Sequence, residues 1–344
     1  MTHALFQSCN VYRYRQPLSK PLPLKTTTLT GREGFILEMF DQNGLVHYGE
    51  ASPLPDFSRE SIVEALKQLM AAAEYYCSRG LPDQSLLYPS VAFAIESVQF
   101  SLGEEQWSQQ KVSESPLLLG VDALTLRRLD DWPEKWPDEF KLKVGRNDTV
   151  QDVGAVHQIL DRIPAHVKLR LDANQRWSID EAIGFARQVP VSRISYIEEP
   201  TPYFEEFPQL FRETGMGYAL DETLQGSAVS ASLSEMNRFR AEDGLRAVVL
   251  KPTLVGGVSQ CLSMANRARK KKVRVVFSSS FESALGLSLI EQLSLQCDPE
   301  ECPGLDTLSA FQNPGFCHLP EYGQRLSSDL LNAMENVWSY RSAL

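Results

Sequence analysis

The sequence has no excess of basic residues and no long apolar run. Lysine and arginine total 34 against 44 aspartate and glutamate among 344 residues, which gives a formal net charge of −10. Because binding to phosphates needs a basic face, this balance argues against a nucleic acid partner and, more weakly, against an anionic membrane surface. A membrane-spanning helix needs roughly 18 apolar residues in a row, and none is expected here. The first ten residues also lack the basic start and apolar core of a secretory signal.

The sequence has no closely spaced cysteine pair of the Cys-x-x-Cys type. Without a secretory signal, six scattered thiols in a chain of this length indicate reduced cysteines and a cytoplasmic protein. The six are Cys9, Cys77, Cys261, Cys297, Cys302 and Cys317.

No Gly-x-Gly-x-x-Gly segment follows an apolar run, which argues against a dinucleotide-binding fold. Short apolar runs nevertheless recur from residue 140 onward, starting 23 to 29 residues apart. Helical segments fit between them, and Ser178–Glu181 has the pattern of a capping box at the start of one. Alternating strands and helices indicate a parallel sheet. The expected strands are Phe140–Val144, Lys168–Asp172, Ile194–Glu198, Gly217–Asp221, Arg246–Leu250 and Val273–Phe277.

The distribution of charge favours a closed barrel over an open sheet, because acids and a lysine stand at the ends of several different strands, where barrel enzymes build their sites. A barrel needs roughly 250 residues, so a smaller domain should accompany it. Asn43-Gly44 between two apolar runs predicts a β-hairpin in that domain. We therefore expect an α/β protein, a (β/α)7β TIM-like barrel over residues 116–311 with an α+β capping domain over 1–115, to which 312–344 return.

Charged residues alternate with apolar ones in two of these strands. Lys141 and Lys143 stand two residues apart, as do Arg170 and Asp172. Since side chains in a strand alternate between faces, each pair points to one side, here the barrel interior. A buried charge costs several kcal/mol unless it is paired or binds a metal. A structural ion-pair network explains the lysines equally well when they are considered alone.

Three acids end three consecutive strands: Asp172, Glu198 and Asp221. The ends of neighbouring parallel strands lie together, and three carboxylates at one place repel each other unless a cation lies among them. Oxygen ligands suit a hard ion. A set of only three protein ligands, which leaves other coordination positions open, is typical of Mg²⁺. None of the five histidines stands at a strand end, which argues against zinc.

Lys251 ends a further strand and should face Lys143 across the barrel. Mutual repulsion and the nearby metal should lower the pKa of both lysines toward the range of a general base. Such a base could remove a proton next to a carboxylate.

These residues resemble the enolase superfamily in its muconate-lactonising branch, in which a lysine base and Mg²⁺ act on a carbon acid. The matching motifs are Lys141-x-Lys143, Asp172-Ala173-Asn174, Glu198-Glu199-Pro200, Asp221-Glu222 and Lys251-Pro252-Thr253. Within that branch the chain is most similar to the o-succinylbenzoate synthase family, a similarity that spans roughly residues 32 to 310. It rests on Gly49–Pro55, Leu169–Asn174, Arg246–Thr253, Ser278–Ser283 and Gly304–Leu308.

The resemblance implies a Mg²⁺-dependent dehydratase of menaquinone biosynthesis, with Mn²⁺ as a substitute metal and a small carboxylate as substrate. Lys143 would act as the base and Lys251 would stabilise the enediolate. The metal ligands would be Asp172, Glu198 and Asp221. The residues implied to contact or shape the substrate site are Lys141, Arg170, Asn174, Ser278, Ser279 and Ser280. For the three serines, helix capping is the alternative explanation.

Other functions remain open at this point. An N-succinylamino acid racemase or a dipeptide epimerase would use the same two lysines. A Schiff-base aldolase, with a lysine on a barrel strand, is a more distant alternative. A non-catalytic barrel that binds a carboxylate is a third. The oligomeric state cannot be predicted from the sequence.

Overall fold

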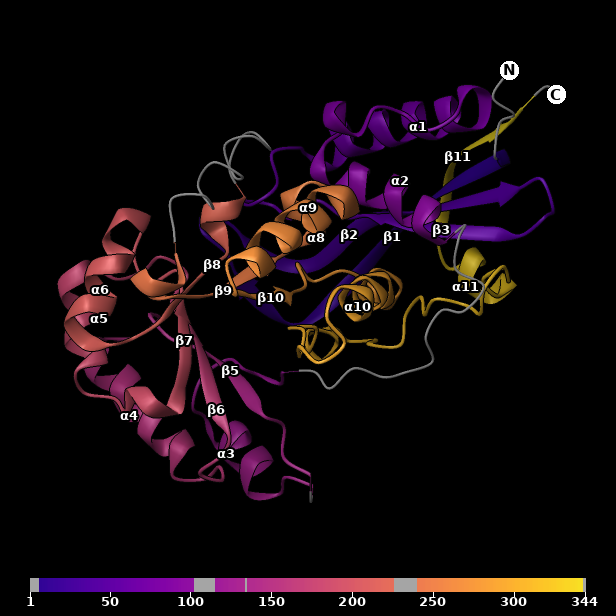
Figure 1. The fold of residues 1–344 in the computed structure, drawn as a ribbon. Coiled ribbons are helices and arrows are strands. Elements are labelled where there is room, and N and C mark those ends of the chain that lie inside the picture. The colour runs from indigo at the N-terminus through magenta and orange to yellow at the C-terminus, as the bar shows by residue number, and fades with distance from the viewer. Residues whose placement is uncertain (1–5, 102–114, 134, 226–239, 343–344) are drawn as a thin grey trace.

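Two β-sheets organise the chain in the computed structural model, which describes residues 6–101, 115–133, 135–225 and 240–342 (Figure 1). The first is an antiparallel sheet with the strand order β11-β1-β2-β3. Its strands are β1 (Phe6–Pro23), β2 (Thr28–Asp41), β3 (Val46–Ala51) and β11 (Glu335–Arg341). Within the part of the chain described, no helix is both long and apolar enough to cross a membrane.

The turn between β2 and β3 is the hairpin expected from Asn43-Gly44. The carboxylate of Asp41 accepts hydrogen bonds from the backbone N–H groups of Asn43 and Leu45, both at 2.8 Å. Gly44 has φ of 81°, in the left-handed region that glycine enters without a Cβ penalty. The hairpin prediction is confirmed, and it fixes the antiparallel register of β2 and β3.

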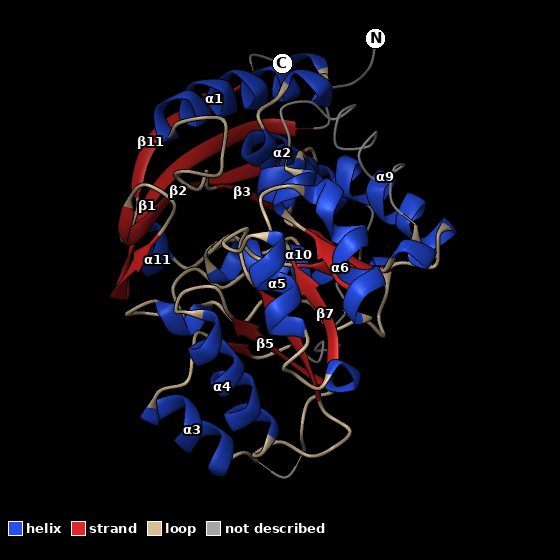
Figure 2. Ribbon diagram, turned by 90° about the vertical axis from the view of Figure 1, so that its left-hand side faces the viewer, coloured by secondary structure: helices blue, strands red, loops and turns tan. Residues whose placement is uncertain are grey.

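Two helices cover one face of this sheet, α1 (Ile62–Arg79) and α2 (Pro89–Ser101) (Figure 2). Ser61 and Glu64 form a capping box at the start of α1. Small and apolar residues of both helices, such as Ala73 and Ile95, are buried against the sheet and form its core. At the other edge β11 pairs with β1, so the end of the chain lies beside its beginning. The domain boundary between residues 115 and 116 stays a prediction, because 102–114 lie outside the described residues.

The second sheet has seven strands, and every neighbouring pair in it is parallel. The strands are β4 (Leu117–Leu118), β5 (Glu139–Lys143), β6 (Lys168–Asp172), β7 (Ile194–Glu198), β8 (Tyr218–Leu220), β9 (Leu245–Leu250) and β10 (Arg274–Phe277). The helices described after residue 115 are, in chain order, α3 (Ala123–Asp130), α4 (Thr149–Leu160), α5 (Ile179–Ala186), α6 (Phe207–Thr214), α8 (Pro252–Val255), α9 (Gly257–Lys270), α10 (Ala284–Cys297) and α11 (Ser328–Asn332). The expected alternation is confirmed, and the capping box at Ser178 and Glu181 starts α5.

A short segment joins the two edges of this sheet. The backbone N–H of Gly304 donates to the carbonyl of Phe277 at 2.8 Å, and the N–H of Ser279 donates back to Gly304 at 3.1 Å. On the other side the N–H of Ser115 donates to the carbonyl of Pro303 at 3.1 Å. Gly304 also makes a parallel bridge with Ser278. This segment occupies the eighth position and closes the ring of strands.

The capping domain is fixed to the barrel by a buried carboxylate at a helix N-terminus. Glu50, at the end of β3, accepts from the backbone N–H groups of Ser283 and Gly286, at 3.1 and 3.0 Å, where α10 begins. It also accepts from the hydroxyls of Ser283 and Tyr14, at 2.5 and 2.6 Å. The positive end of the helix dipole favours a carboxylate there. This contact holds the loop after β3 over the barrel.

Candidate active site

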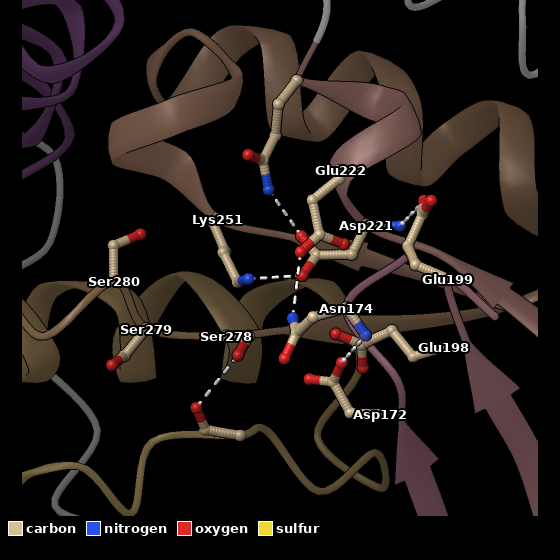
Figure 3. Close-up of polar contacts among 12 residues, drawn as sticks. Asp172, Asn174, Glu198, Glu199, Asp221, Glu222, Lys251, Ser278, Ser279 and Ser280 are labelled. Atoms are coloured by element: carbon tan, nitrogen blue, oxygen red, sulfur yellow. Dashed lines mark hydrogen bonds and ion pairs between the residues drawn. The ribbon is translucent and has the colours of Figure 1, made fainter. Parts of the chain in front are cut away.

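The three acids predicted as metal ligands lie together at the carboxyl ends of the barrel strands (Figure 3). Asp172 and Glu198 are the last residues of β6 and β7 and stand directly opposite each other in the strand register. Asp221 follows β8 immediately. All three are at most 1% exposed. The parallel order of the strands therefore gathers them as expected from the sequence.

Three lysine ammonium groups lie among these acids. The Nζ atom of Lys141 is 2.7 Å from Oδ2 of Asp172 and 2.9 Å from both carboxylate oxygens of Glu198. Lys143 Nζ lies 2.6 Å from the same Asp172 oxygen. Lys251 Nζ forms an ion pair with Asp221, as Figure 3 also shows. The lysine side chains are only 12% to 17% exposed, so these charges interact in a poorly solvated space.

The charges shift the pKa values of the site in different directions. Burial is the largest effect on Lys143, and with the repulsion from Lys141 and Lys251 it lowers the pKa of Lys143 despite the attraction of Asp172. This agrees with the expectation for a general base. Burial and repulsion from Asp172 and Asp221 raise the pKa of Glu198 well above its usual range.

The expectation that the pKa of Lys251 also falls is not met among the protein groups of the site. Burial lowers the pKa of Lys251, but the carboxylates of Asp221 and Glu222 outweigh it and raise the pKa above the usual lysine value. The pKa of Lys141 is likewise raised, against the effect of burial, by Asp172 and Glu198. The sequence shows that acids lie near these lysines, but it does not show which lysine contacts which acid.

The donor set suits a hard divalent cation. Among the residues that the structure describes, no three His, Cys, Asp or Glu side chains are arranged as a ready metal cluster. The ammonium groups described above lie between the carboxylates instead. Four acids, Asp172, Glu198, Asp221 and Glu222, accompany three lysines, so the negative charge of this group exceeds the positive charge when all are ionised. A cation placed among oxygen ligands would balance it, so these residues fit Mg²⁺.

Glu199 organises the loops around the acids, a role that the sequence did not reveal. Its carboxylate accepts from the backbone N–H groups of Asp221 and Thr223, both at 2.8 Å. It also accepts from the Thr223 hydroxyl at 2.9 Å and from Nε2 of Gln175 at 2.8 Å. Burial, together with the neighbouring carboxylate of Glu222, raises the pKa of Glu199 to about 7. Its position directly after Glu198 was the only available signal.

Backbone strain concentrates at the same strand ends. Asn174, Gln175 and Glu199 have φ of 46°, 61° and 43°, in the left-handed region that side chains other than glycine rarely adopt. Such strain persists only where surrounding contacts enforce it, and it is common at functional sites. Here Asn174 accepts from Lys143 at 2.8 Å and donates to Glu222 at 3.0 Å. The expected position of Asn174 beside the acids is therefore observed.

Arg170 lies deeper in the barrel than the three acids, within a buried ion-pair network. Although Arg170 points into the barrel, as Asp172 does, it lies one layer nearer the amino ends of the strands and is 2% exposed. Its guanidinium donates to the carboxylates of Glu139 and Glu301 and, at 2.8 Å, to the carbonyl of Cys302. Each of its three nitrogens thus bonds within a structural network, and Arg170 lines neither of the cavities described below, so its contact with a substrate stays a prediction.

The three serines stand at the other side of the mouth, beyond β10, to the left of the acids in Figure 3. Their hydroxyls already have partners within the protein. Ser278 donates to the Gly304 carbonyl at 3.2 Å, Ser279 pairs with the Thr307 hydroxyl at 2.8 Å, and Ser280 accepts from Thr253 at 3.2 Å. None of them caps α10, whose N-cap residue is Ser283.

A cavity of about 750 Å³ lies above this site, between the two domains. Lys143, Lys251, Asn174 and Glu222 line it from the barrel, as do Ser279 and Ser280. The capping domain contributes Leu22–Lys25, from the end of β1 and the turn after it, and Leu54 and Phe57 from the loop after β3. The loop after β3, which carries Leu54 and Phe57, is therefore part of the site wall. A smaller pocket of about 70 Å³ adjoins Lys141 and Ser278.

Comparison with known proteins agrees with this architecture. Residues 127–310 match the family model described as enolase C-terminal domain-like, and residues 6–102 match that of the MenC N-terminal domain. An o-succinylbenzoate synthase of Vibrio cholerae serotype O1 (strain M66-2) is 34% identical over 337 residues, covering 97% of this chain and 98% of that protein. One from Pectobacterium atrosepticum is 36% identical over 319 residues, covering 90% and 93%.

Solved structures share the fold at lower identity. An o-succinylbenzoate synthase from Thermosynechococcus elongatus BP-1, complexed with Mg, has a TM-score of 0.70 at 23% identity, over 88% of this chain and 93% of that one. A dipeptide epimerase from Cytophaga hutchinsonii has a TM-score of 0.77 at 18% identity, over 98% and 99%. The fold alone thus does not separate synthases from epimerases, whereas the sequence relatives do. The chain belongs to the o-succinylbenzoate synthase family of the enolase superfamily.

Proposed function

We propose that this protein dehydrates 2-succinyl-6-hydroxy-2,4-cyclohexadiene-1-carboxylate to o-succinylbenzoate, a step of menaquinone biosynthesis. The observation that carries the proposal is the identity of 34% to 36% with named o-succinylbenzoate synthases over at least 90% of the chain. The acids and lysines at the strand ends supply groups suited to this chemistry. A cytoplasmic location stays a prediction.

Asp172, Glu198 and Asp221 are the proposed ligands of Mg²⁺, for which Mn²⁺ could substitute. The support is their burial, their convergence from three consecutive strands and their oxygen donors. When bound, the metal supplies positive charge that stabilises the enediolate form of the substrate carboxylate. Glu199 would keep the backbone of Asp221 in place through its four hydrogen bonds.

Lys143 is the proposed general base. Its ammonium group borders the cavity, and its pKa is lowered by burial and by the two neighbouring lysines. In its neutral form it would take the proton from C1, the ring carbon that carries the carboxylate. The resulting lysine ammonium would then return that proton to the C6 hydroxyl as the C6–O bond breaks. One water leaves, the C1–C6 double bond forms and the ring becomes aromatic. The same group acting twice makes this a syn elimination.

Lys251 and Lys141 would remain cationic and stabilise the negative charge that develops on the substrate carboxylate. Their raised pKa values support this role, because both groups stay protonated near neutral pH. Lys251 comes from β9 and Lys143 from β5, on different sides of the site. Asn174, Ser279 and Ser280 border the cavity and are proposed to contact the substrate. Ser278 borders the smaller pocket next to Lys141.

Racemisation of an N-succinylamino acid is the second candidate, because a 1,1-proton transfer would use the same two lysines. An N-succinyl Arg/Lys racemase from Bacillus cereus ATCC 14579 shares the fold, with a TM-score of 0.76 at 17% identity. Proton exchange measured by NMR on N-succinylamino acids, beside the dehydration assay, separates the two. Rapid exchange without dehydration of the diene would overturn the proposed function.

Removal of the metal tests the same proposal against an aldolase. EDTA should abolish dehydration and Mg²⁺ should restore it, and borohydride should trap no adduct of substrate with a lysine. Covalent trapping together with indifference to EDTA would instead indicate a Schiff base. Loss of dehydration in Lys143→Ala with an unchanged fold would exclude a barrel that only binds carboxylates.

A further inference from the structure

Two arginines at the rim of the cavity form no ion pair with any residue that the structure describes, although the charge of Asp172 acts on Arg146. Arg146 follows β5 and Arg176 follows β6, and both line the cavity above the acids. Within the described residues neither guanidinium has an ion pair or a hydrogen bond. In contrast, each nitrogen of the inward-pointing Arg170 donates to a protein partner, namely Glu139, Cys302 or Glu301.

The loops that carry the two arginines are packed closely together. A Cβ atom at Gly145 would lie 3.1 Å from Cβ of Arg176 and 3.0 Å from the Ala173 carbonyl. Gly145 has φ of 75° and donates its N–H to the buried Asp152 carboxylate at 2.6 Å. Arg146 is the next residue, so its backbone is fixed beside Arg176. Two like charges held near each other favour an anion between them.

The chemistry of the proposed substrate supplies such an anion. It carries two carboxylates, one on the ring carbon that loses the proton and one at the end of the four-carbon succinyl arm. The first has to lie at Lys143, where the proton is removed. The second needs a separate site, and a guanidinium is well suited because its planar donors match a carboxylate with two hydrogen bonds.

Other polar groups at the cavity are less available. The hydroxyls of Ser278 and Ser279 beyond β10 are already paired with Gly304 and Thr307, as described above. Lys25 also borders the cavity, but its ammonium lies over the ring of Phe57, 4.6 Å from the centroid. Glu222 brings a negative charge to the same wall.

We propose that Arg146 and Arg176 form an anion subsite that binds the terminal carboxylate of the succinyl arm. The subsite rests on the proposed function for the identity of its ligand. It places the arm toward the loops after β5 and β6, away from Ser278–Ser280. Specificity for a succinyl group would then come from the barrel loops as well as from the capping domain.

The test compares two ligands on the Mg²⁺-loaded enzyme by titration calorimetry. One is o-succinylbenzoate, and the other is 2-butanoylbenzoate, in which a methyl group replaces the terminal carboxylate. In the wild type, loss of that carboxylate should weaken binding at least about tenfold, as expected for charge-assisted hydrogen bonds. In Arg146→Met/Arg176→Met the two ligands should bind within about threefold of each other, because the groups that distinguish them are gone.

Matched variants keep the result interpretable. Arg187→Met removes one positive charge from an exposed pair with Glu213 and should discriminate as the wild type does. Arg146→Lys keeps the positive charge but lacks the paired N–H donors of a guanidinium. This variant should keep only part of the wild-type discrimination between the two ligands. If the double variant fails to fold, Arg176→Met alone should still lose most of it. The proposal is overturned if the variants that fold discriminate as strongly as the wild type, or if Arg187→Met loses as much.

The two proposals can fail separately. If the wild type dehydrates the diene but Arg146→Met/Arg176→Met discriminates between the two ligands as strongly as the wild type, only the proposed subsite is refuted. If the wild type binds o-succinylbenzoate through this pair but does not dehydrate the diene, the proposed function is refuted and the proposed subsite is supported.

Discussion

The buried network around Glu139 should make this protein sensitive to acid. Glu139 lies at the amino end of β5 and receives Arg170, both terminal nitrogens of Arg274, at 2.9 and 2.8 Å, and the hydroxyl of Ser195. Burial alone would raise the pKa of Glu139. The hydrogen bonds from Arg274 and the charges of Arg170 and Arg274 outweigh it and lower the pKa to about 2.

The size and sign of the effect follow from that shift. A fall from the usual value of 4.5 to about 2 corresponds to about 3 kcal/mol, at about 1.4 kcal/mol per pH unit. Because the folded pKa is the lower one, this stabilisation is present above pH 4.5 and is lost as the pH falls through 4.5 toward 2. Glu139→Gln removes it, so the free energy of unfolding at pH 7 should fall by about 3 kcal/mol.

Chemical denaturation of wild type and Glu139→Gln across pH 3 to 7 measures this difference. The two curves should approach each other as the pH falls. Glu213→Gln is the control, because its exposed ion pair with Arg187 should contribute no more than about 1 kcal/mol. A loss at pH 7 of under 1 kcal/mol, or a constant gap between the curves, would refute the reasoning.

Two further predictions concern carboxylates that accept four hydrogen bonds each. In Glu50→Gln, an NH2 group that cannot accept hydrogen bonds replaces one carboxylate oxygen among the donors of Tyr14, Ser283 and Gly286. The free energy of unfolding should therefore fall by about 2 kcal/mol. Thermal denaturation checks this, and an unchanged midpoint would contradict it. Glu199→Gln should weaken Mg²⁺ affinity about 10- to 100-fold, since Glu199 supports the backbone of Asp221. A Mg²⁺ titration of dehydration rates checks this, and an unchanged half-saturation point would contradict it.

Much of the barrel could be predicted from local patterns in the sequence. Each expected strand from residue 140 onward agrees with the observed one to within about one residue, because parallel strands buried on both faces are short continuous apolar runs. The acids at their ends needed no long-range information, since parallel strands bring those ends together. The hairpin at Asn43-Gly44 and the capping box at Ser178 are local signals as well.

Other features depend on residues that are distant in the sequence. Arg170 follows the same inward-pointing pattern as Asp172, but its partners Glu301 and Cys302 come from the segment that closes the barrel more than 130 residues later. Only the three-dimensional arrangement shows that each of its nitrogens has a partner there. The closing segment itself contains Pro303 and Gly304 and lacks the apolar run of a strand.

The pKa values of the lysines also required the structure. Sequence spacing put Lys143 and Lys251 on the inner face, but the sign of each shift depends on which carboxylate lies nearest. Lys251 contacts Asp221, which raises its pKa, whereas burial and two lysine neighbours lower that of Lys143. The pKa values of the two lysines are therefore shifted in opposite directions.

The most direct test of the central claim is the rate of o-succinylbenzoate formation from the cyclohexadiene substrate. It is measured on the wild type with Mg²⁺, on the wild type with EDTA and on Lys143→Ala with Mg²⁺. The account predicts rapid formation in the first case, none above background with EDTA, and a loss of at least about a hundredfold in Lys143→Ala with the fold retained. Undiminished product formation by folded Lys143→Ala, or by the EDTA-treated enzyme, would contradict it.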